Sequence, residues 1–142
     1  MSTLERAIEI AAEAHSGQRD KAGAPYISHP LRVALAFIRS NDEKRAIIAV
    51  LHDVVEDSAW TFTDLTNEGF SEEIVDAVNA LTRPDDEPYE AFVRRAGANA
   101  LAKPVKLADL RDNIARTQLA KLEPEELKAR LDKYEGALAQ LA

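Results

Sequence analysis

The sequence contains no cysteine, and its 142 residues include only five glycines and six prolines. Without cysteine, a thiolate zinc site, a disulfide framework and a thiol nucleophile are all excluded. No apolar run approaches the roughly 18 residues that a membrane-spanning helix needs, so we expect no contact with a membrane. The first residues lack the basic and then apolar order of a signal peptide, which indicates a soluble, cytoplasmic protein.

Positive charge is also scarce. Lys and Arg number 18 against 25 for Asp and Glu, which gives a formal net charge of −7. Binding to DNA or RNA generally needs a basic face, so this balance argues against a nucleic-acid partner. The length fits one domain, because a chain of roughly 150 residues buries about 70% of its unfolded surface. Such a chain forms a core without a disulfide or a structural metal.

Apolar residues recur mostly three and four positions apart, which is typical of amphipathic helices. We therefore predict an all-α fold, with residues 1–142 in a single domain of about eight helices. The expected helices cover residues 3–15, 30–39, 42–57, 61–68, 72–82, 89–96 and 104–121, with a last one from 124. Residues 16–30 lack periodicity and read as an irregular loop. The last helix has an apolar face that fits either the core or a second copy of the chain, at Leu127, Leu131, Tyr134 and Leu138.

Four polar residues lie near the end of the expected helix 42–57: His52, Asp53, Glu56 and Asp57. Helical spacing sets His52 beside Glu56 and Asp53 beside Asp57. Carboxylates are unfavourable at a helix C-terminus, where the dipole prefers cations. A divalent metal ion would compensate for this cost, and a solvated acidic helix end explains the residues about equally well.

Two further clusters carry polar groups. His29 ends the loop, where alone it reads more simply as a packing or capping residue. The loop could wrap a phosphorylated ligand, although its composition favours an ordinary surface turn; its hydrogen-bond donors are Gln18, Arg19, Lys21 and Tyr26. Helix 104–121 carries a third cluster at helical spacing, for which a surface salt bridge is the simplest explanation if the helix stood alone: Lys106, Asp109 and Asn113.

Taken together, the clusters offer two imidazoles and two carboxylates: His29, His52, Asp53 and Asp109. This set is harder than a cysteine-rich zinc site and suits Mn²⁺, Fe²⁺ or a similar divalent ion with open positions. Such an ion can lower the pKa of a bound water toward 7. Glu56 and Asp57, one turn beyond, are placed to orient that water or take its proton.

Four segments follow one another in the order of a known family: Ala14-His15-Ser16-Gly17-Gln18, Lys21-x-Gly23-x-Pro25-Tyr26-Ile27-x-His29-Pro30, His52-Asp53-Val-Val-Glu56-Asp57 and Val105-Lys106-Leu107-Ala108-Asp109. They resemble the HD-domain hydrolases of the RelA/SpoT type, especially the free-standing small alarmone hydrolases. The resemblance covers about residues 7–116.

The resemblance implies an all-α HD fold with one Mn²⁺ bound by His29, His52, Asp53 and Asp109. It also implies that Glu56 and Asp57 activate water, and that the substrate contacts Lys21, Tyr26, Lys106 and Asn113. The implied reaction removes the 3′-pyrophosphate of guanosine tetra- or pentaphosphate, a small phosphorylated nucleotide. We expect hydrolysis alone, because no synthetase or regulatory region accompanies the motifs.

Two departures from the family pattern affect substrate recognition. The family's usual Arg-Lys pair in the loop reads Asp20-Lys21 here, which replaces a base-stacking cation by a carboxylate. Residues 114–116 also lack the family's common Met-Arg-Thr. A different substrate, such as NADPH, therefore stays an alternative, as does a non-catalytic nucleotide-binding module, although the complete ligand set argues against the latter. For three further polar residues a place in solvent is favoured over one in the pocket: Tyr89, Arg94 and Arg95.

Overall fold

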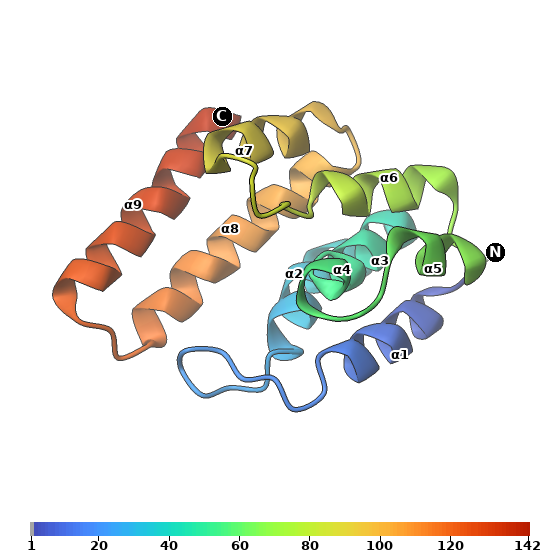
Figure 1. The fold of residues 1–142 in the computed structure, drawn as a ribbon, viewed down its shortest axis with the longest axis horizontal. Helices are drawn as coiled ribbons and strands as arrows, with labels where there is room; N and C mark the ends of the chain where they lie inside the picture. The colour runs from blue at the N-terminus through green and yellow to red at the C-terminus, as the bar shows by residue number, and fades with distance from the viewer. Residues whose placement is uncertain (1) are drawn as a thin grey trace.

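The computed structural model describes residues 2–142, and within them the chain forms α-helices joined by loops (Figure 1). The all-α prediction is confirmed: the described residues contain no strand, only one isolated bridge between Arg19 and Pro25. The helices are α1 (Leu4–Ala14), α2 (Ser28–Arg39), α3 (Glu43–Leu51), α4 (Val54–Asp57), α5 (Phe62–Asn67), α6 (Glu72–Ala80), α7 (Tyr89–Ala98), α8 (Ala102–Leu119) and α9 (Pro124–Leu141).

Several helices begin where a short polar side chain caps the first free backbone amides. Thr3, Asp42 and Ser71 each accept a hydrogen bond from the backbone N–H three residues ahead. Thr61 and Asp64 form a reciprocal capping box at the start of α5. Such caps satisfy donors that have no partner within the helix, which fixes these helix starts locally.

The main core surrounds α3. Its residues 46–51 are all buried, and α3 packs against α1, α2, α6 and α8. A helical segment that is apolar on every side, as residues 46–51 are, belongs in the interior, because no face of it gains from contact with water. The C-terminal end of α3 is therefore held at the centre of the molecule, and His52 follows directly.

A second, smaller core joins α7, α8 and α9, which lie together on one side of the molecule (Figure 1). Its buried members are Val93, Leu110, Ala137 and Leu141. Tyr134 and Leu138 of α9 pack against it, so part of the apolar face of α9 is used within the chain. No helix among residues 2–142 combines the length and the apolar composition needed to cross a bilayer.

Candidate metal centre and active site

The chain breaks between α3 and α4, so the expectation of one helix over residues 42–57 is wrong. His52 Nδ1 lies 2.6 Å from the carbonyl oxygen of Ala49, and the backbone N–H of His52 bonds the same oxygen at 3.4 Å. A bond to the residue three back tightens the turn and ends the α-helical pattern. Neighbours in a continuous helix point in different directions. Because of the break, His52 Nε2 and Asp53 Oδ2 instead lie 3.1 Å apart.

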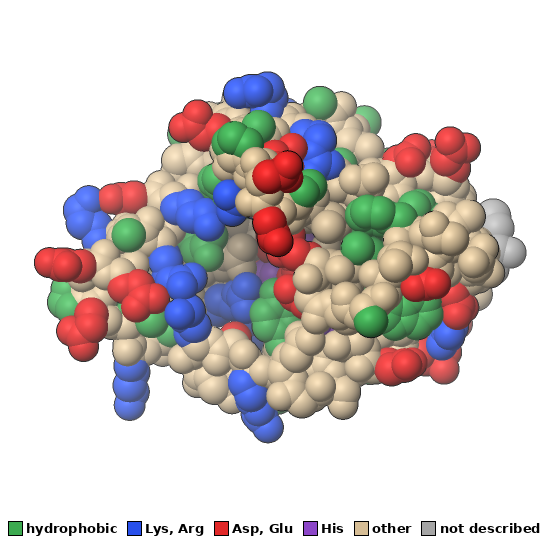
Figure 2. Space-filling model, viewed as in Figure 1, with side chains coloured by type: hydrophobic (Ala, Val, Ile, Leu, Met, Phe, Trp, Pro, Cys, Tyr) green, Lys and Arg blue, Asp and Glu red, His purple; other side chains and the backbone are tan. Residues whose placement is uncertain are grey.

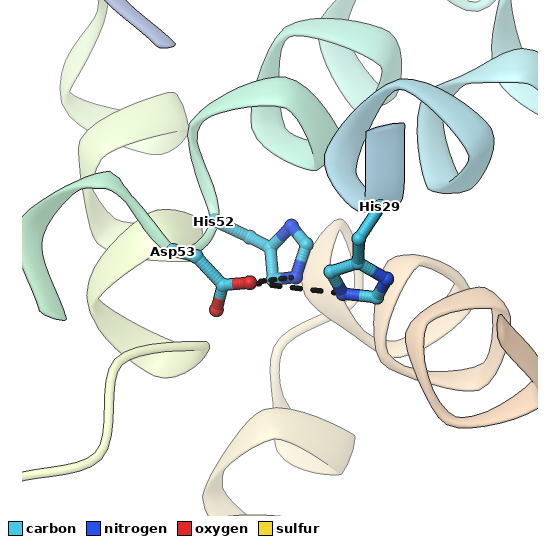
Figure 3. A group of neighbouring side chains, drawn as sticks. All are labelled: His29, His52 and Asp53. Carbon is cyan, nitrogen blue, oxygen red and sulfur yellow. Dashed lines mark ion pairs between the residues drawn. The ribbon is translucent and has the colours of Figure 1, made fainter. Parts of the chain in front are cut away.

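Four side chains from three distant segments gather at this break. Figure 3 shows His29, from the first turn of α2, pointing toward His52 and Asp53. The donor atoms of these three residues all lie within 4.8 Å of one another. Asp109 of α8 reaches the same place, with Oδ1 2.9 Å from His29 Nε2 and 3.2 Å from His52 Nε2. The structure therefore brings all four predicted ligands together.

The outer nitrogen of each imidazole is bound to an oxygen. His29 Nδ1 lies 2.6 Å from Asp112 Oδ2, and His52 Nδ1 bonds the Ala49 carbonyl. Both acceptors lack a proton to give, so each Nδ1 carries the hydrogen. When the rings are neutral, each Nε2 lone pair then points into the cluster, which is the arrangement found at metal-bound histidines.

The charges in the cluster also suit a cation. Burial opposes a charge on His52, but the carboxylates of Asp53 and Asp109 outweigh it and raise the pKa of His52 well above its ordinary value. Burial likewise opposes ionisation of Asp109, yet Lys106 and the imidazoles hold its pKa well below the usual range. The buried carboxylate of Asp109 and the partly buried carboxylate of Asp53 thus attract positive charge to one point. This donor set fits a divalent metal ion and could hold one.

Asp109 and Asp53 are each fixed by further polar contacts. Lys106 Nζ lies 3.0 Å from Asp109 Oδ2, and Asn113 Nδ2 donates to Asp109 Oδ1 at 3.3 Å. The Tyr26 hydroxyl donates to Asp53 Oδ2 at 2.7 Å. These three residues, predicted to contact substrate, therefore hold the carboxylates of the cluster. All three also line a cavity of about 170 Å³ beside it, whose wall includes Asp53 and Asp109.

The two acidic residues of α4 differ in position. Glu56 lines the cavity, and its Oε1 accepts a hydrogen bond from the backbone N–H of Arg83 at 2.9 Å. Desolvation is the main cause that raises the pKa of Glu56. Asp57 lies outside the cavity wall; desolvation and repulsion from Asp53 and Glu56 raise its pKa to about 6. Both carboxylates can thus take up a proton closer to neutral pH than an ordinary carboxylate.

Lys21 lies away from the cluster of His29, His52, Asp53 and Asp109 and does not line the cavity beside it. Its side chain is exposed, and Nζ lies 3.3 Å from Glu126 Oε1 of α9. It lines a second cavity of about 320 Å³, which shares Tyr26, Arg116 and Tyr134 with the first. In Figure 2, Lys and Arg side chains gather beside a hollow, and acidic and histidine side chains are visible within it. In a protein of net charge −7, this local basic character favours an anionic ligand.

Asp20 also lies at the second cavity, where the resemblance had led us to expect repulsion of a polyphosphate. Its Oδ1 accepts hydrogen bonds from the backbone N–H groups of Ala22 and Ala24, both at 2.9 Å. The loop turns at Gly23, whose φ of 84° is readily adopted only by glycine. Asp20 thus stabilises the turn of the loop, and much of its hydrogen-bonding capacity is used there.

Sequence reasoning missed several residues around the centre. Asp112, which holds His29, also accepts two hydrogen bonds from Arg32 at 2.7 and 3.0 Å. Arg116 lines both cavities and donates to Asn113. A signal for these residues exists, because polar positions recur three and four apart on one face of α8: Lys106, Asp109, Asp112, Asn113 and Arg116.

Three residues for which solvent was favoured behave differently from one another. The placement of Tyr89 in solvent is wrong, since Tyr89 lines the first cavity and its hydroxyl is buried. Arg95 bonds Glu87 and the backbone carbonyls of Asn79 and Thr82, so it supports the loop before α7. Arg94 is exposed as expected.

The family follows from comparison with known proteins. A family model described as an HD domain matches residues 7–116. The chain therefore belongs to the HD domain family, as the motifs predicted. It is 34% identical over 137 residues to a GTP pyrophosphokinase of Streptomyces coelicolor. The matched region covers 89% of this chain and 16% of that protein.

A second curated relative is the guanosine-3′,5′-bis(diphosphate) 3′-pyrophosphohydrolase of Aquifex aeolicus, 32% identical over 120 residues, or 78% of this chain and 17% of that protein. The chain thus spans less than a fifth of the length of these relatives. A solved structure described as a metazoan ortholog of SpoT that hydrolyzes ppGpp has a TM-score of 0.78 at 24% identity. The match covers 99% of this chain and 92% of that one, and it establishes the shared fold.

Proposed function

We propose that this protein is a metal-dependent phosphohydrolase that removes the 3′-pyrophosphate group of guanosine 3′,5′-bis(diphosphate). The observation that carries the proposal is the meeting of two imidazoles and two carboxylates beside a cavity with basic walls. A relative named for this hydrolysis supports the choice of substrate. Residues 1–142 would act as one domain.

His29, His52, Asp53 and Asp109 would hold the ion. A mixed imidazole and carboxylate set suits Mn²⁺, Fe²⁺ or a similar ion, and we favour Mn²⁺ because the resemblance to the RelA/SpoT-type hydrolases implies it. When bound, the ion would lower the pKa of a water molecule and polarise a phosphoryl oxygen. The chain's own residues would orient this centre: Asp112 fixes the ring of His29, Lys106 fixes Asp109, and Tyr26 fixes Asp53. Each of these bonds reduces the freedom of a ligand to turn away.

Glu56 is our choice for the group that takes the proton from the attacking water. It lines the cavity, and the bond from Arg83 holds one of its oxygens in place. Its raised pKa makes it a better proton acceptor near neutral pH than an ordinary glutamate. Asp57, the next residue along, would assist by raising the negative charge near Glu56 and by accepting a proton in turn.

The two cavities share three wall residues, and they would take the two parts of a phosphorylated nucleotide. The smaller one has cations beside the metal cluster for the phosphate groups: Arg83, Lys106, Arg116 and Lys133. The larger one would take the nucleoside, with Lys21 and Arg19 at the loop and Tyr26 shared between the two. Neither self-association nor a cytoplasmic location follows from this geometry, and both stay predictions from the sequence.

The test is hydrolysis by the purified protein loaded with Mn²⁺, with products separated by ion exchange. We expect GDP and pyrophosphate from guanosine 3′,5′-bis(diphosphate). Glu56→Gln should keep Mn²⁺ bound and lose most of the turnover, whereas Asp132→Asn, at an exposed ion pair with Lys128, should match the wild type. An inactive wild-type protein with Mn²⁺ bound would refute this substrate, and a panel that includes NADPH would then identify another.

A further inference from the structure

The side-chain amide of Gln18 connects three parts of the structure. Its Nε2 donates to the carbonyl oxygens of Ala14, at 3.2 Å, and Asp57, at 2.9 Å. Its Oε1 lies 2.9 Å from His15 Nδ1. Carbonyl oxygens only accept, so the two backbone contacts fix which end of the amide carries the hydrogens. It follows that Oε1 accepts and that His15 Nδ1 is the donor.

His15 is an unexpected residue for this position. It is only 2% exposed, and burial lowers its pKa and so favours the neutral ring. With the hydrogen on Nδ1, Nε2 is left as a buried acceptor with no partner among the described residues. An unmet buried acceptor costs about 1–3 kcal/mol, a cost that an aliphatic side chain would avoid. The position therefore needs the Nδ1–H group that binds Gln18.

The same imidazole also contacts Tyr26, a residue that binds one of the predicted metal ligands. The ring of His15 packs against the ring of Tyr26, with 5.0 Å between the ring centres. The hydroxyl of Tyr26 in turn donates to Asp53. His15 thus contacts one residue that holds a predicted ligand and one that holds the end of α4.

Gln18 binds the end of α4, a helix too short to be stable by itself. α4 is a single turn of four residues, and only Val54 is buried among them. One turn of helix is unstable in isolation, because nucleation fixes several residues for a single hydrogen bond. Glu56 and Asp57 both extend from this turn, and the carbonyl that Gln18 binds belongs to Asp57. The position of both carboxylates therefore depends on contacts from outside α4.

We infer that His15 and Gln18 are positioning residues that hold the α4 turn, and with it Glu56 and Asp57, in place beside the metal cluster. The inference rests on the proposed hydrolase function. Neither residue lines either cavity, so neither contacts the substrate. Their loss should therefore lower kcat through the placement of the carboxylates and leave KM nearly unchanged.

The first test is Gln18→Met, which keeps the length of the side chain and removes its hydrogen bonds. We expect kcat to fall about ten- to a hundredfold, because a displacement of about 1 Å has an effect of that size. KM and the affinity for Mn²⁺ should change by less than about twofold. The matched control is Gln140→Met, which removes a glutamine bond to the carbonyl of Glu90. Neither of these two residues lines a cavity, so all three values should stay unchanged. A wild-type kcat in Gln18→Met would overturn the inference.

A pair of His15 variants separates positioning from packing. His15→Asn keeps an N–H donor near the place of Nδ1 and should retain most of kcat. His15→Leu fills the space without a donor and should lose most of kcat. The inference is wrong if His15→Leu has the higher kcat of the two variants. It is also wrong, and the role structural only, if kcat and the affinity for Mn²⁺ fall and KM rises in both.

One measurement is independent of catalysis. A long-range ¹⁵N–¹H spectrum of the wild-type protein at pH 7 should show His15 neutral, with its hydrogen on Nδ1. A neutral ring with its hydrogen on Nε2, which could not donate from Nδ1 to Gln18, would overturn the inference. If the spectrum is as expected but the wild-type protein does not hydrolyse guanosine 3′,5′-bis(diphosphate), the proposed substrate is wrong. Gln18→Met is then compared on whichever nucleotide of the panel the protein does hydrolyse.

Discussion

Removal of Asp112 tests whether residues that contact the predicted ligands set the affinity of the site for Mn²⁺. Asp112 Oδ2 lies 2.6 Å from His29 Nδ1, opposite the nitrogen that faces Asp109. In Asp112→Ala, the His29 ring loses the contact that fixes its orientation and its tautomer. Loss of such an outer contact weakens metal binding by about 10–100-fold. We therefore expect the free energy of Mn²⁺ binding to weaken by about 1.4–2.8 kcal/mol.

The same substitution should destabilise the protein without metal. His29 is 1% exposed, so its Nδ1–H would be left buried without an acceptor, at a cost of about 1–3 kcal/mol. Titration calorimetry with Mn²⁺ and urea unfolding measure the two effects separately. Asp112→Asn keeps an oxygen acceptor and should lose less affinity than Asp112→Ala.

Arg32→Ala is the control for charge, because the half-exposed Arg32 contacts Asp112 but not His29. We expect its Mn²⁺ affinity to stay within about threefold of the wild type. Unchanged affinity in Asp112→Ala, with the protein folded, would refute the reasoning. An equal loss in Arg32→Ala would show that charge at this position matters more than the orientation of the ring.

Three further outcomes are expected. The pKa of Asp57 is raised to about 6 in the folded protein, so its ionisation destabilises the fold as pH rises from its pKa in the unfolded chain toward 6. Asp57→Asn should therefore stabilise the metal-free protein more at pH 8 than at pH 4. An equal gain in the free energy of unfolding at both pH values, measured by urea unfolding, would contradict this. Lys106→Met breaks the buried ion pair with Asp109 and should lower the free energy of unfolding by about 3 kcal/mol. This is the low end for a broken buried pair, because two imidazoles still face Asp109. A urea midpoint equal to that of the wild type would contradict the prediction. Asp20→Asn should keep turnover and the loop turn, whereas Asp20→Arg should lower the melting temperature and fail to raise turnover; higher turnover in Asp20→Arg would show that this carboxylate repels the substrate.

The helices were predictable where local chemistry decides them. The cap of α6 at Ser71 and the three- and four-residue spacing of apolar residues are properties of short segments, and the structure has both. The donor chemistry of the side chains suggested His29, His52, Asp53 and Asp109 as one set, and the family resemblance implied the same set. Spacing could not bring them together, since these residues come from three separate segments.

The break at His52 and Asp53 was not predictable in the same way. Apolar residues continue at helical spacing through Val50, Leu51 and Val54, so the pattern shows no interruption. The break goes with the contacts of the His52 side chain, which bonds the carbonyl of Ala49 and lies beside the carboxylate of Asp109. Likewise, Asp20 appears in the sequence as a charge near the substrate, and only the folded loop shows that its oxygen binds two backbone amides.

The position of Asp109 on α8 has a consequence for how the chain matures. His29 Nε2 and Asp109 Oδ1 lie 2.9 Å apart although 80 residues separate them in sequence. The four predicted ligands therefore come together only after α8 has packed against α2 and α3. A partly folded chain would present fewer ligands and bind the ion weakly, so the ion would select the finished fold and stabilise it by mass action. Retention of the ion during purification would then serve as a measure of the fraction of correctly folded molecules.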